Sequence, residues 1–261
     1  MNKIEPIIED RIEFFIIDNI LMKMINPFDE QRDVIIPHVF KNGEKITAIS
    51  GKFCEGKFGK ITISDGIKMI NESAFRDAKC TEVRWSSGCS EIPVTCFDNC
   101  TLTKLTNIDN VDNIEMCAFA LSWLTELTWP SKCKDIPPGC FMSSRIKTIT
   151  NIDHVESIGG NAFDSCVITH FNWPSGCKII PRGCFQGCTQ LETVSNLSVV
   201  SHIEKNAFAD CSSIESLDFS GAVGMTTDTG AFVRAPREKI IFPYYSLQEA
   251  IESSFRKPKI F

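Results

Sequence analysis

The chain has 261 residues, 43% of them hydrophobic, and a formal net charge of −6. It contains no run of basic residues, so nucleic acid and anionic membrane surfaces are disfavoured as partners. The hydrophobic content is enough for a continuous core, and phenylalanine, with 19 residues, is far more common than tyrosine, with 2.

Residues 1–44 are predicted to form an N-terminal cap with a lead-in strand. Acidic residues interrupt the apolar positions of residues 1–28, which argues against a signal peptide or a membrane span and for a cytoplasmic protein. The alternative is a cell-surface location reached by an unconventional route. Apolar residues spaced from Pro6 to Leu21 fit an amphipathic helix, which either covers the open end of the repeats that follow or docks on a partner.

A fixed period of phenylalanines marks residues 45–243 as a repeat array. Most steps between them are 22 residues, and the last two are 23 and 24. The series comprises Phe53, Phe75, Phe97, Phe119, Phe141, Phe163, Phe185, Phe208 and Phe232. Such a period predicts a solenoid, in which each turn of chain adds one rung that contacts only its neighbours. A stack of rungs presents a long surface rather than a deep pocket, so we expect binding rather than chemistry.

Each rung is predicted to contain a short strand with one apolar and one polar face. Two apolar residues three positions apart are followed, two residues later, by a column that alternates between tryptophan and asparagine. This column comprises Trp85, Asn107, Trp129, Asn151, Trp173, Asn196 and Phe219. Because side chains alternate along a strand, we expect the column to share the buried face. Equivalent strands run in the same direction and therefore form a parallel sheet.

A turn precedes each phenylalanine. Motifs such as INESAF and IGGNAF place Asn, Gly and Ser before a short helical or 3₁₀ turn, and from Phe75 onward a small residue, Ala or Cys, stands directly before each Phe of the series. Odd and even rungs differ, so the full period is 44 residues, which indicates duplication of a two-rung unit. Tryptophan in one layer beside asparagine in the next also alternates large with small side chains in the packing.

These motifs identify a family resemblance. The pattern IGxxAFxxC followed by spaced leucine and isoleucine resembles the BspA-type (Treponema pallidum-type) leucine-rich repeats over about residues 45–243. The resemblance implies a leucine-rich-repeat-like right-handed solenoid, with one parallel β-sheet and short strands or 3₁₀ turns on the opposite side. It implies adhesion or protein binding and carries over no catalytic residue. The odd rungs depart from the pattern by using IPxGCF.

Residues 244–261 are predicted to form a C-terminal cap. Ser246 stands where it would cap the N-terminus of a short helix, and that helix would cover the last rung.

The thirteen cysteines are interpreted mainly as core residues. Several occupy columns that hold alanine, valine or isoleucine in other rungs, as buried free thiols often do. These are Cys89, Cys96, Cys133, Cys140, Cys177 and Cys184. Equivalent cysteines two rungs apart would lie about 10 Å apart, too far for a disulfide. Cys166, Cys188 and Cys211 fall on consecutive rungs, where we expect stacked thiols, with a disulfide as the alternative. We expect the cysteines to be reduced and to hold no metal.

Candidates for catalysis or cofactor binding are sparse. The four histidines are His38, His154, His170 and His202. None belongs to a recognisable catalytic, zinc-binding or phosphate-binding motif. Asp109 and Asp153 recur 44 residues apart, but calcium needs six or more oxygen ligands, so a turn role is favoured. We expect no enzymatic activity and no cofactor.

The candidate binding surface is the strand face, by which we mean the outward-facing positions of the predicted strands. Its candidate partner-binding residues are Glu82, Arg84, Lys104, Thr106, Glu126, Thr128, Thr150, His170 and Asn172. A further outward position is predicted at Ser86, Ile108, Pro130, Ile152, Pro174 and Leu197, three of which would add exposed apolar spots. The alternative is that these residues only keep the sheet soluble.

The predicted function is a non-enzymatic protein–protein interaction module, monomeric and without membrane insertion, that binds a protein through the strand face. One alternative is a cell-surface, adhesin-like protein that binds host or matrix proteins. A scaffold that self-associates through an end, and an enzyme with a cleft of clustered titratable groups, are further alternatives.

Overall fold

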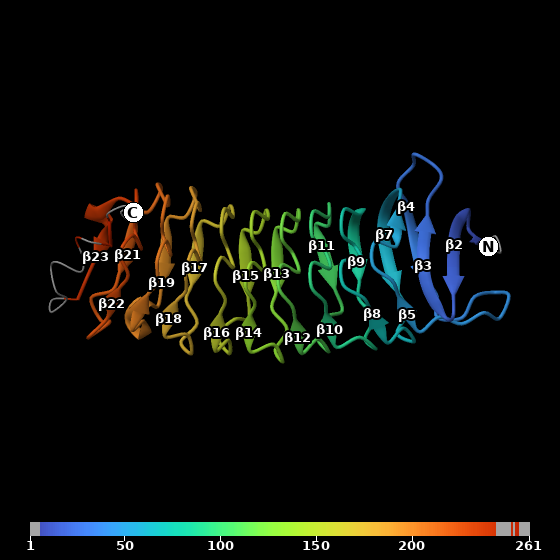
Figure 1. The fold of residues 1–261 in the computed structure, drawn as a ribbon, viewed down its shortest axis with the longest axis horizontal. Coiled ribbons are helices and arrows are strands. Elements are labelled where there is room, and N and C mark those ends of the chain that lie inside the picture. The colour runs from blue at the N-terminus through green and yellow to red at the C-terminus, as the bar shows by residue number, and fades with distance from the viewer. Residues whose placement is uncertain (1–5, 244–251, 253, 256–261) are drawn as a thin grey trace, which may run out of the picture. The chain divides into compact units, whose positions relative to one another are not determined.

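The structure, a computed structural model, describes residues 6–243, 252, 254 and 255 and divides into two compact units. Unit 1 spans Met1–Thr125 and unit 2 spans Glu126–Phe261. In each unit the chain winds through successive rungs of parallel strands, so the predicted solenoid class is confirmed (Figure 1). Helix within residues 6–243 is limited to two 3₁₀ turns, η1 (Leu197–Val199) and η2 (Arg237–Lys239).

Unit 1 carries two sets of parallel strands. The longer strands pair in the order β4–β7–β9–β11, and the short strands lie on the opposite side of each rung (Figure 1). The longer set is β4 (Arg32–Ile36), β7 (Lys57–Ile63), β9 (Lys79–Arg84) and β11 (Lys104–Thr106). The short set is β5 (Ala48–Ile49), β6 (Cys54–Glu55), β8 (Met69–Ile70), β10 (Glu91–Ile92) and β12 (Asn113–Ile114).

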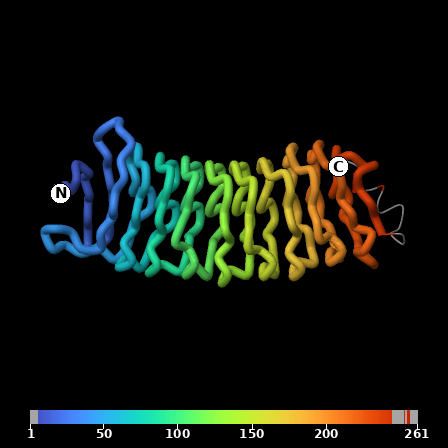
Figure 2. Tube along the Cα trace, turned by 180° about the vertical axis from the view of Figure 1, so that it is seen from behind, coloured from blue at the N-terminus to red at the C-terminus, as the bar shows by residue number. Residues whose placement is uncertain are grey.

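Unit 2 repeats this arrangement, and Figure 2 shows its successive turns from behind. The strands of the strand face are β13 (Glu126–Thr128), β15 (Thr148–Thr150), β17 (His170–Asn172), β19 (Thr193–Ser195), β21 (Ser216–Asp218) and β23 (Ile240–Ile241). The opposite strands are β14 (Asp135–Ile136), β16 (Ser157–Ile158), β18 (Ile179–Ile180), β20 (His202–Ile203) and β22 (Thr226–Thr227).

The predicted N-terminal helix is wrong, because this segment forms an antiparallel meander of β1 (Ile7–Glu9), β2 (Ile12–Ile17) and β3 (Ile20–Ile25). Each hairpin has a two-residue turn in which both residues have positive φ: 48° and 69° at residues 10 and 11, and 49° and 62° at residues 18 and 19. This is the type I′ geometry that matches the twist of a hairpin. The many isoleucines favour strands for the same segment.

The meander nevertheless covers the first rung. Strand β3 pairs in parallel with both β5 and β6, and Leu21 and Met24 on β3 are fully buried. The ring of Phe14 packs edge-on against Phe40, with centroids 5.1 Å apart. The apolar end of unit 1 is therefore closed by added strands rather than by a helix.

The phenylalanine column forms the core of each unit. Rings of Phe75, Phe97 and Phe119 stack with centroids 5.0 and 5.6 Å apart in unit 1, and the stack from Phe141 to Phe255 in unit 2 has spacings between 5.3 and 5.6 Å. The backbone N–H of most of these phenylalanines donates to the carbonyl of the small residue in the next rung at 2.8 or 2.9 Å. Because the side chains of the Ala and Cys column are small, the backbone carbonyl of this column can approach the phenylalanine turn without crowding the stacked rings.

The column continues past the predicted end of the repeats at Pro243. The N–H of Phe232 donates to Ser254 O at 2.8 Å, and the Phe255 ring stacks on Phe232. Phe255 is one further step of 23 residues along the chain, so the signal was present in the sequence. The predicted capping role of Ser246, and most of the predicted helix, lie outside the described residues.

The turns before each phenylalanine are of the 3₁₀ type, with bonds such as Arg76 N–H to Ser73 O at 3.0 Å. The residue two positions before each phenylalanine of the column from Phe75 to Phe232 has a φ between 50° and 84°, which explains Gly139 and the Asn and Ser of other rungs.

The alternating column does not lie wholly in the core. Its tryptophans are fully buried, but Asn107, Asn151 and Asn196 take left-handed φ values of 63°, 60° and 63° and turn outward. Their Nδ2 groups donate to the carbonyl of the tryptophan one rung before, at 2.7, 2.8 and 2.7 Å. The asparagine side chain thus supplies a hydrogen bond between rungs at the point where the backbone has left the strand. The prediction that tryptophan and asparagine alternate as large and small side chains in the core is wrong.

This change of direction overturns a second prediction. Ile108, Ile152 and Leu197, which follow these asparagines, are buried at 7%, 4% and 2% exposure instead of forming exposed apolar spots. The equivalent Ser86, Pro130 and Pro174, which follow the tryptophans, are buried too. Strict alternation holds through the last residue of each short strand and fails at or just after the Trp and Asn column, so the outward face of a rung is narrower than predicted.

We expect Asn151→Ala to destabilise the protein by about 2 kcal/mol, because it removes a hydrogen bond and leaves a side chain in the left-handed region. Asn151→Gly removes only the hydrogen bond and should cost about 1 kcal/mol or less. Urea unfolding followed by circular dichroism measures both, with the exposed Thr148→Ala as a control near zero. Equal stability of the Ala and Gly variants would contradict the backbone argument.

Candidate functional site

The strand face of unit 1 brings together the four candidate residues predicted there. Lys104 and Thr106 on β11 lie directly beside Glu82 and Arg84 on β9, in register. Glu82 forms ion pairs with Lys60 at 2.8 Å and with Lys104 at 3.7 Å. Side chains from three successive rungs thus form a row of alternating charge.

Arg84 is held in place by the rung before it. Its Nη1 lies 3.1 Å from Asp65 Oδ1 and 3.4 Å from the carbonyl of Ile63. The hydrogen bond from Arg84, with further bonds from Ser87, lowers the pKa of Asp65 to about 2. The guanidinium is therefore oriented before any partner arrives, while a third of its side chain stays exposed.

The strand face of unit 2 brings together its own five candidates. Glu126 and Thr128 on β13 pair in register with Thr148 and Thr150 on β15, and the two hydroxyls at 128 and 150 are 3.2 Å apart. On β17, His170 Nδ1 lies 2.9 Å from Thr193 Oγ1. Beside it, Asn172 Oδ1 accepts a hydrogen bond from Ser195 at 2.9 Å. These side chains are exposed, and several of them bond along the stack through hydroxyl, amide and imidazole groups rather than through a Lys–Glu–Lys row like that of unit 1.

A groove beside the strand face of unit 1 was missed from sequence. Its cavity volume is about 380 Å³. It is lined by Gln31, Lys57, Phe58, Lys79, Thr81, Thr101, Thr103 and Trp123. Trp123 is 43% exposed, whereas the other three tryptophans are fully buried. The signal was available: Trp123 stands outside the alternating tryptophan column, at a position held by lysine, threonine and arginine in neighbouring rungs.

The threonines of this groove use their hydroxyls internally. Thr81 Oγ1 donates to Gly59 O at 3.1 Å, Thr101 Oγ1 to Cys80 O at 3.1 Å, and Thr103 Oγ1 to the carbonyl of Thr81 at 3.0 Å. Since each hydroxyl is committed to the backbone of the preceding rung, the methyl groups remain to line the groove. The surface around Trp123 is thereby apolar although its residues are largely threonine.

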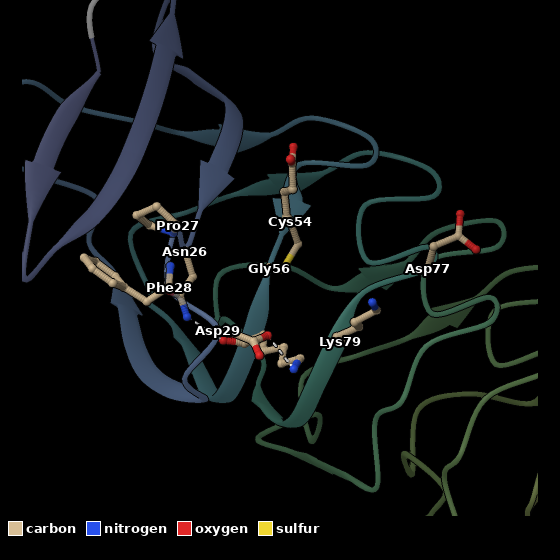
Figure 3. Close-up of a pocket in the computed structure, with 10 residues that line it drawn as sticks. Asn26, Pro27, Phe28, Asp29, Cys54, Gly56, Asp77 and Lys79 are labelled. Carbon is tan, nitrogen blue, oxygen red and sulfur yellow. Dashed lines mark hydrogen bonds and ion pairs between the residues drawn. The ribbon is translucent and has the colours of Figure 1, made fainter.

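A second pocket of unit 1, of about 420 Å³, contains titratable groups (Figure 3). Burial raises the pKa of the Cys54 thiol well above its usual value. A hydrogen bond from Lys57 lowers the pKa of Asp29, and one from Asn99 lowers that of Asp77. The thiol is therefore protonated and both carboxylates are ionised at neutral pH.

The cysteine columns are core, as predicted, but with a more specific role. Cys166, Cys188 and Cys211 each donate the thiol to a phenylalanine carbonyl of the preceding rung, at 2.8, 2.9 and 2.9 Å. All thirteen cysteines are unbridged, and all except Cys54 and Cys117 are buried. Cys80 and Cys100, from different columns, have sulfurs 3.7 Å apart.

Within the described residues, no three or more His, Cys, Asp and Glu side chains are grouped so that they could hold a metal ion. No helix in that part of the chain is long and apolar enough to cross a bilayer.

Rungs of parallel strands around a phenylalanine stack define a leucine-rich-repeat solenoid. The family model for the BspA type leucine rich repeat region matches residues 44–169 and 156–260, in six copies. The chain belongs to this family. Its first match begins at residue 44, next to the predicted boundary at residue 45, and its second extends past Pro243 to include Phe255.

Solved structures agree on the fold. A crystal structure of the T. pallidum leucine rich repeat protein TpLRR has a TM-score of 0.50 and 17% identity, over 80% of this chain and 91% of that one. The pneumococcal vaccine antigen PcpA has a TM-score of 0.50 and 14% identity, over 89% of this chain and 80% of that one. No curated protein sequence matches the chain.

The buried thiols should make the protein sensitive to alkaline pH. Burial raises the pKa of Cys89 and Cys177 to about 11 and that of Cys166 to about 12. In the unfolded chain thiols titrate near about pH 8.5, so above that pH the unfolded state releases protons that the folded state keeps. The free energy of unfolding should therefore fall as pH rises from 8.5 to 10, by up to about 1.4 kcal/mol per pH unit for each thiol.

Urea unfolding in the presence of a reductant, at several pH values, measures this slope. Cys177→Val supplies the control, because valine occupies this column at residues 155 and 200 and packs there without a proton to lose. The free energy of unfolding of this variant should fall less steeply with pH than that of the wild type, by the contribution of about one proton. A wild-type stability that is flat across this window would refute the prediction.

Proposed function

We propose that the chain is a non-enzymatic protein-interaction module that binds a protein partner through the strand face of unit 1. The observation that carries the proposal is the row of Lys60, Glu82 and Lys104 beside the anchored Arg84. Charged side chains held by neighbouring rungs lose little conformational freedom on binding, so they favour a partner of complementary charge. The chain also belongs to a family of stacked repeats, and solenoids of this kind commonly bind partners through their extended surfaces, which supports the same proposal.

An adhesin-like protein that binds host or matrix proteins is the second candidate, because one of the similar folds is described as a vaccine antigen. The two candidates differ in where the partner is met, in the cytoplasm or at the cell surface. Labelling of intact source cells with a membrane-impermeant reagent separates them, and an unlabelled protein would exclude the adhesin.

We expect the double variant Arg84→Glu/Lys104→Glu to weaken partner capture by about tenfold or more, since it reverses two charges on the strand face. Affinity capture from the source cell, with quantitative mass spectrometry, measures the loss. Lys132→Glu/Lys178→Glu is the matched control, with the same change in net charge at exposed positions in the segments that lead to β14 and β18. Capture of the same proteins at the same level by both double variants would exclude the strand face of unit 1.

A further inference from the structure

We propose that the groove around Trp123 takes an acidic peptide segment of the protein partner, with an apolar side chain of the peptide in the groove and its carboxylates beside Lys57 and Lys79. The inference rests on the proposed function and names the part of the partner that is recognised.

Trp123 is the first reason for placing a partner here. Every other tryptophan obeys the repeat and is fully buried, whereas Trp123 stands outside the alternating column and is 43% exposed. The equivalent residue one rung earlier is Thr101, and that rung folds in the same way. Exposed tryptophan beside an apolar surface is the side chain most enriched among residues that dominate protein–protein binding energy.

The same rung departs from the repeat at a second position. Leu121 has a φ of 55° and is 48% exposed, where neighbouring rungs place Asn99 and Ser143. A leucine in the left-handed region is strained, and its exposed side chain recovers none of that energy through burial. Two exposed apolar residues within one rung point to selection for the surface rather than for the core.

The lining of the groove determines the shape of what enters. The threonine methyl groups, the edge of Phe58 and the indole of Trp123 form apolar walls, because the hydroxyls of Thr81, Thr101 and Thr103 are bonded to backbone carbonyls. Gln31 closes one side by donating to Phe58 O at 3.0 Å. A cavity of about 380 Å³ has room for a large aliphatic or aromatic side chain.

The charged residues of the groove determine which peptide residues can stand beside the apolar side chain. Its only charged lining residues are Lys57 and Lys79, although the chain as a whole has a net charge of −6. Lys57 already pairs with Asp29 at 2.5 Å, whereas Lys79 forms no ion pair among the described residues. A carboxylate next to the apolar side chain of a peptide would therefore meet a lysine that forms no ion pair in the described part of the chain and interacts through space with Asp29. A basic peptide would be repelled.

The test uses the full chain and a displayed library of short random peptides. Peptides enriched on the wild type should share an aromatic or large aliphatic residue flanked by Asp or Glu. In fluorescence anisotropy they should lose about tenfold or more affinity for Trp123→Thr, which installs the residue of the preceding rung. Lys79→Glu should produce a comparable loss, and Trp123→Phe should retain most of the affinity.

Acrylamide quenching of tryptophan fluorescence gives an independent readout, since Trp123 is the accessible tryptophan and bound peptide should protect it. The proposal is overturned if no peptide is enriched, if enriched peptides lack acidic residues, or if they bind Trp123→Thr as tightly as the wild type at unchanged thermal stability. Peptide binding that depends on Trp123, together with partner capture that ignores Arg84 and Lys104, would leave the groove standing and remove the strand face alone.

Discussion

The hydrogen bond from a phenylalanine N–H to the carbonyl of the small residue in the next rung is the contact on which each unit depends. It recurs at 2.8 or 2.9 Å and holds the phenylalanine rings in a stack with centroids 5.0 to 5.6 Å apart. The spacing of the rungs follows from it, and so does the preference for a small residue directly before the phenylalanines from Phe75 onward, because the carbonyl must approach the turn closely. Thiols such as Cys188 then donate to the phenylalanine carbonyls themselves, so these buried carbonyls are bonded along the stack.

A core built by repetition leaves the surface free to differ from rung to rung. The strand face varies between a row of alternating charge in unit 1 and hydroxyl, amide and imidazole groups in unit 2. The repeat also makes departures visible, because a tryptophan and a leucine stand at outward positions where neighbouring rungs have polar residues. Recognition by this protein is therefore expected where the rungs break their own pattern, as at Trp123, rather than where they obey it.

Errors in prediction arose where local backbone geometry overrides periodicity. The apolar spacing of residues 7–21 fits both a helix and a pair of hairpins, and the positive φ at Asp18 and Asn19 decides for hairpins, since two-residue turns of this type end a strand abruptly. Asparagine at residue 151 looks like a core residue by alternation, yet its left-handed φ turns it outward and brings Ile152 into the core. The nine strand-face candidates flank the inward residues of their strands, such as Leu105 and Leu127, where alternation holds, and all nine are at least partly exposed.

The repeat period, the core columns and the family followed from the sequence alone. Every rung must present similar side chains to its neighbours, so equivalent residues recur at a fixed spacing along the chain. Which outward residues meet was decided only by the tertiary structure. Lys57 and Trp123 are three rungs apart in sequence, and they line one groove because parallel stacking brings equivalent positions side by side. The groove is apolar because three threonine hydroxyls donate hydrogen bonds to carbonyls of the preceding rung. Composition and spacing do not determine these side-chain orientations.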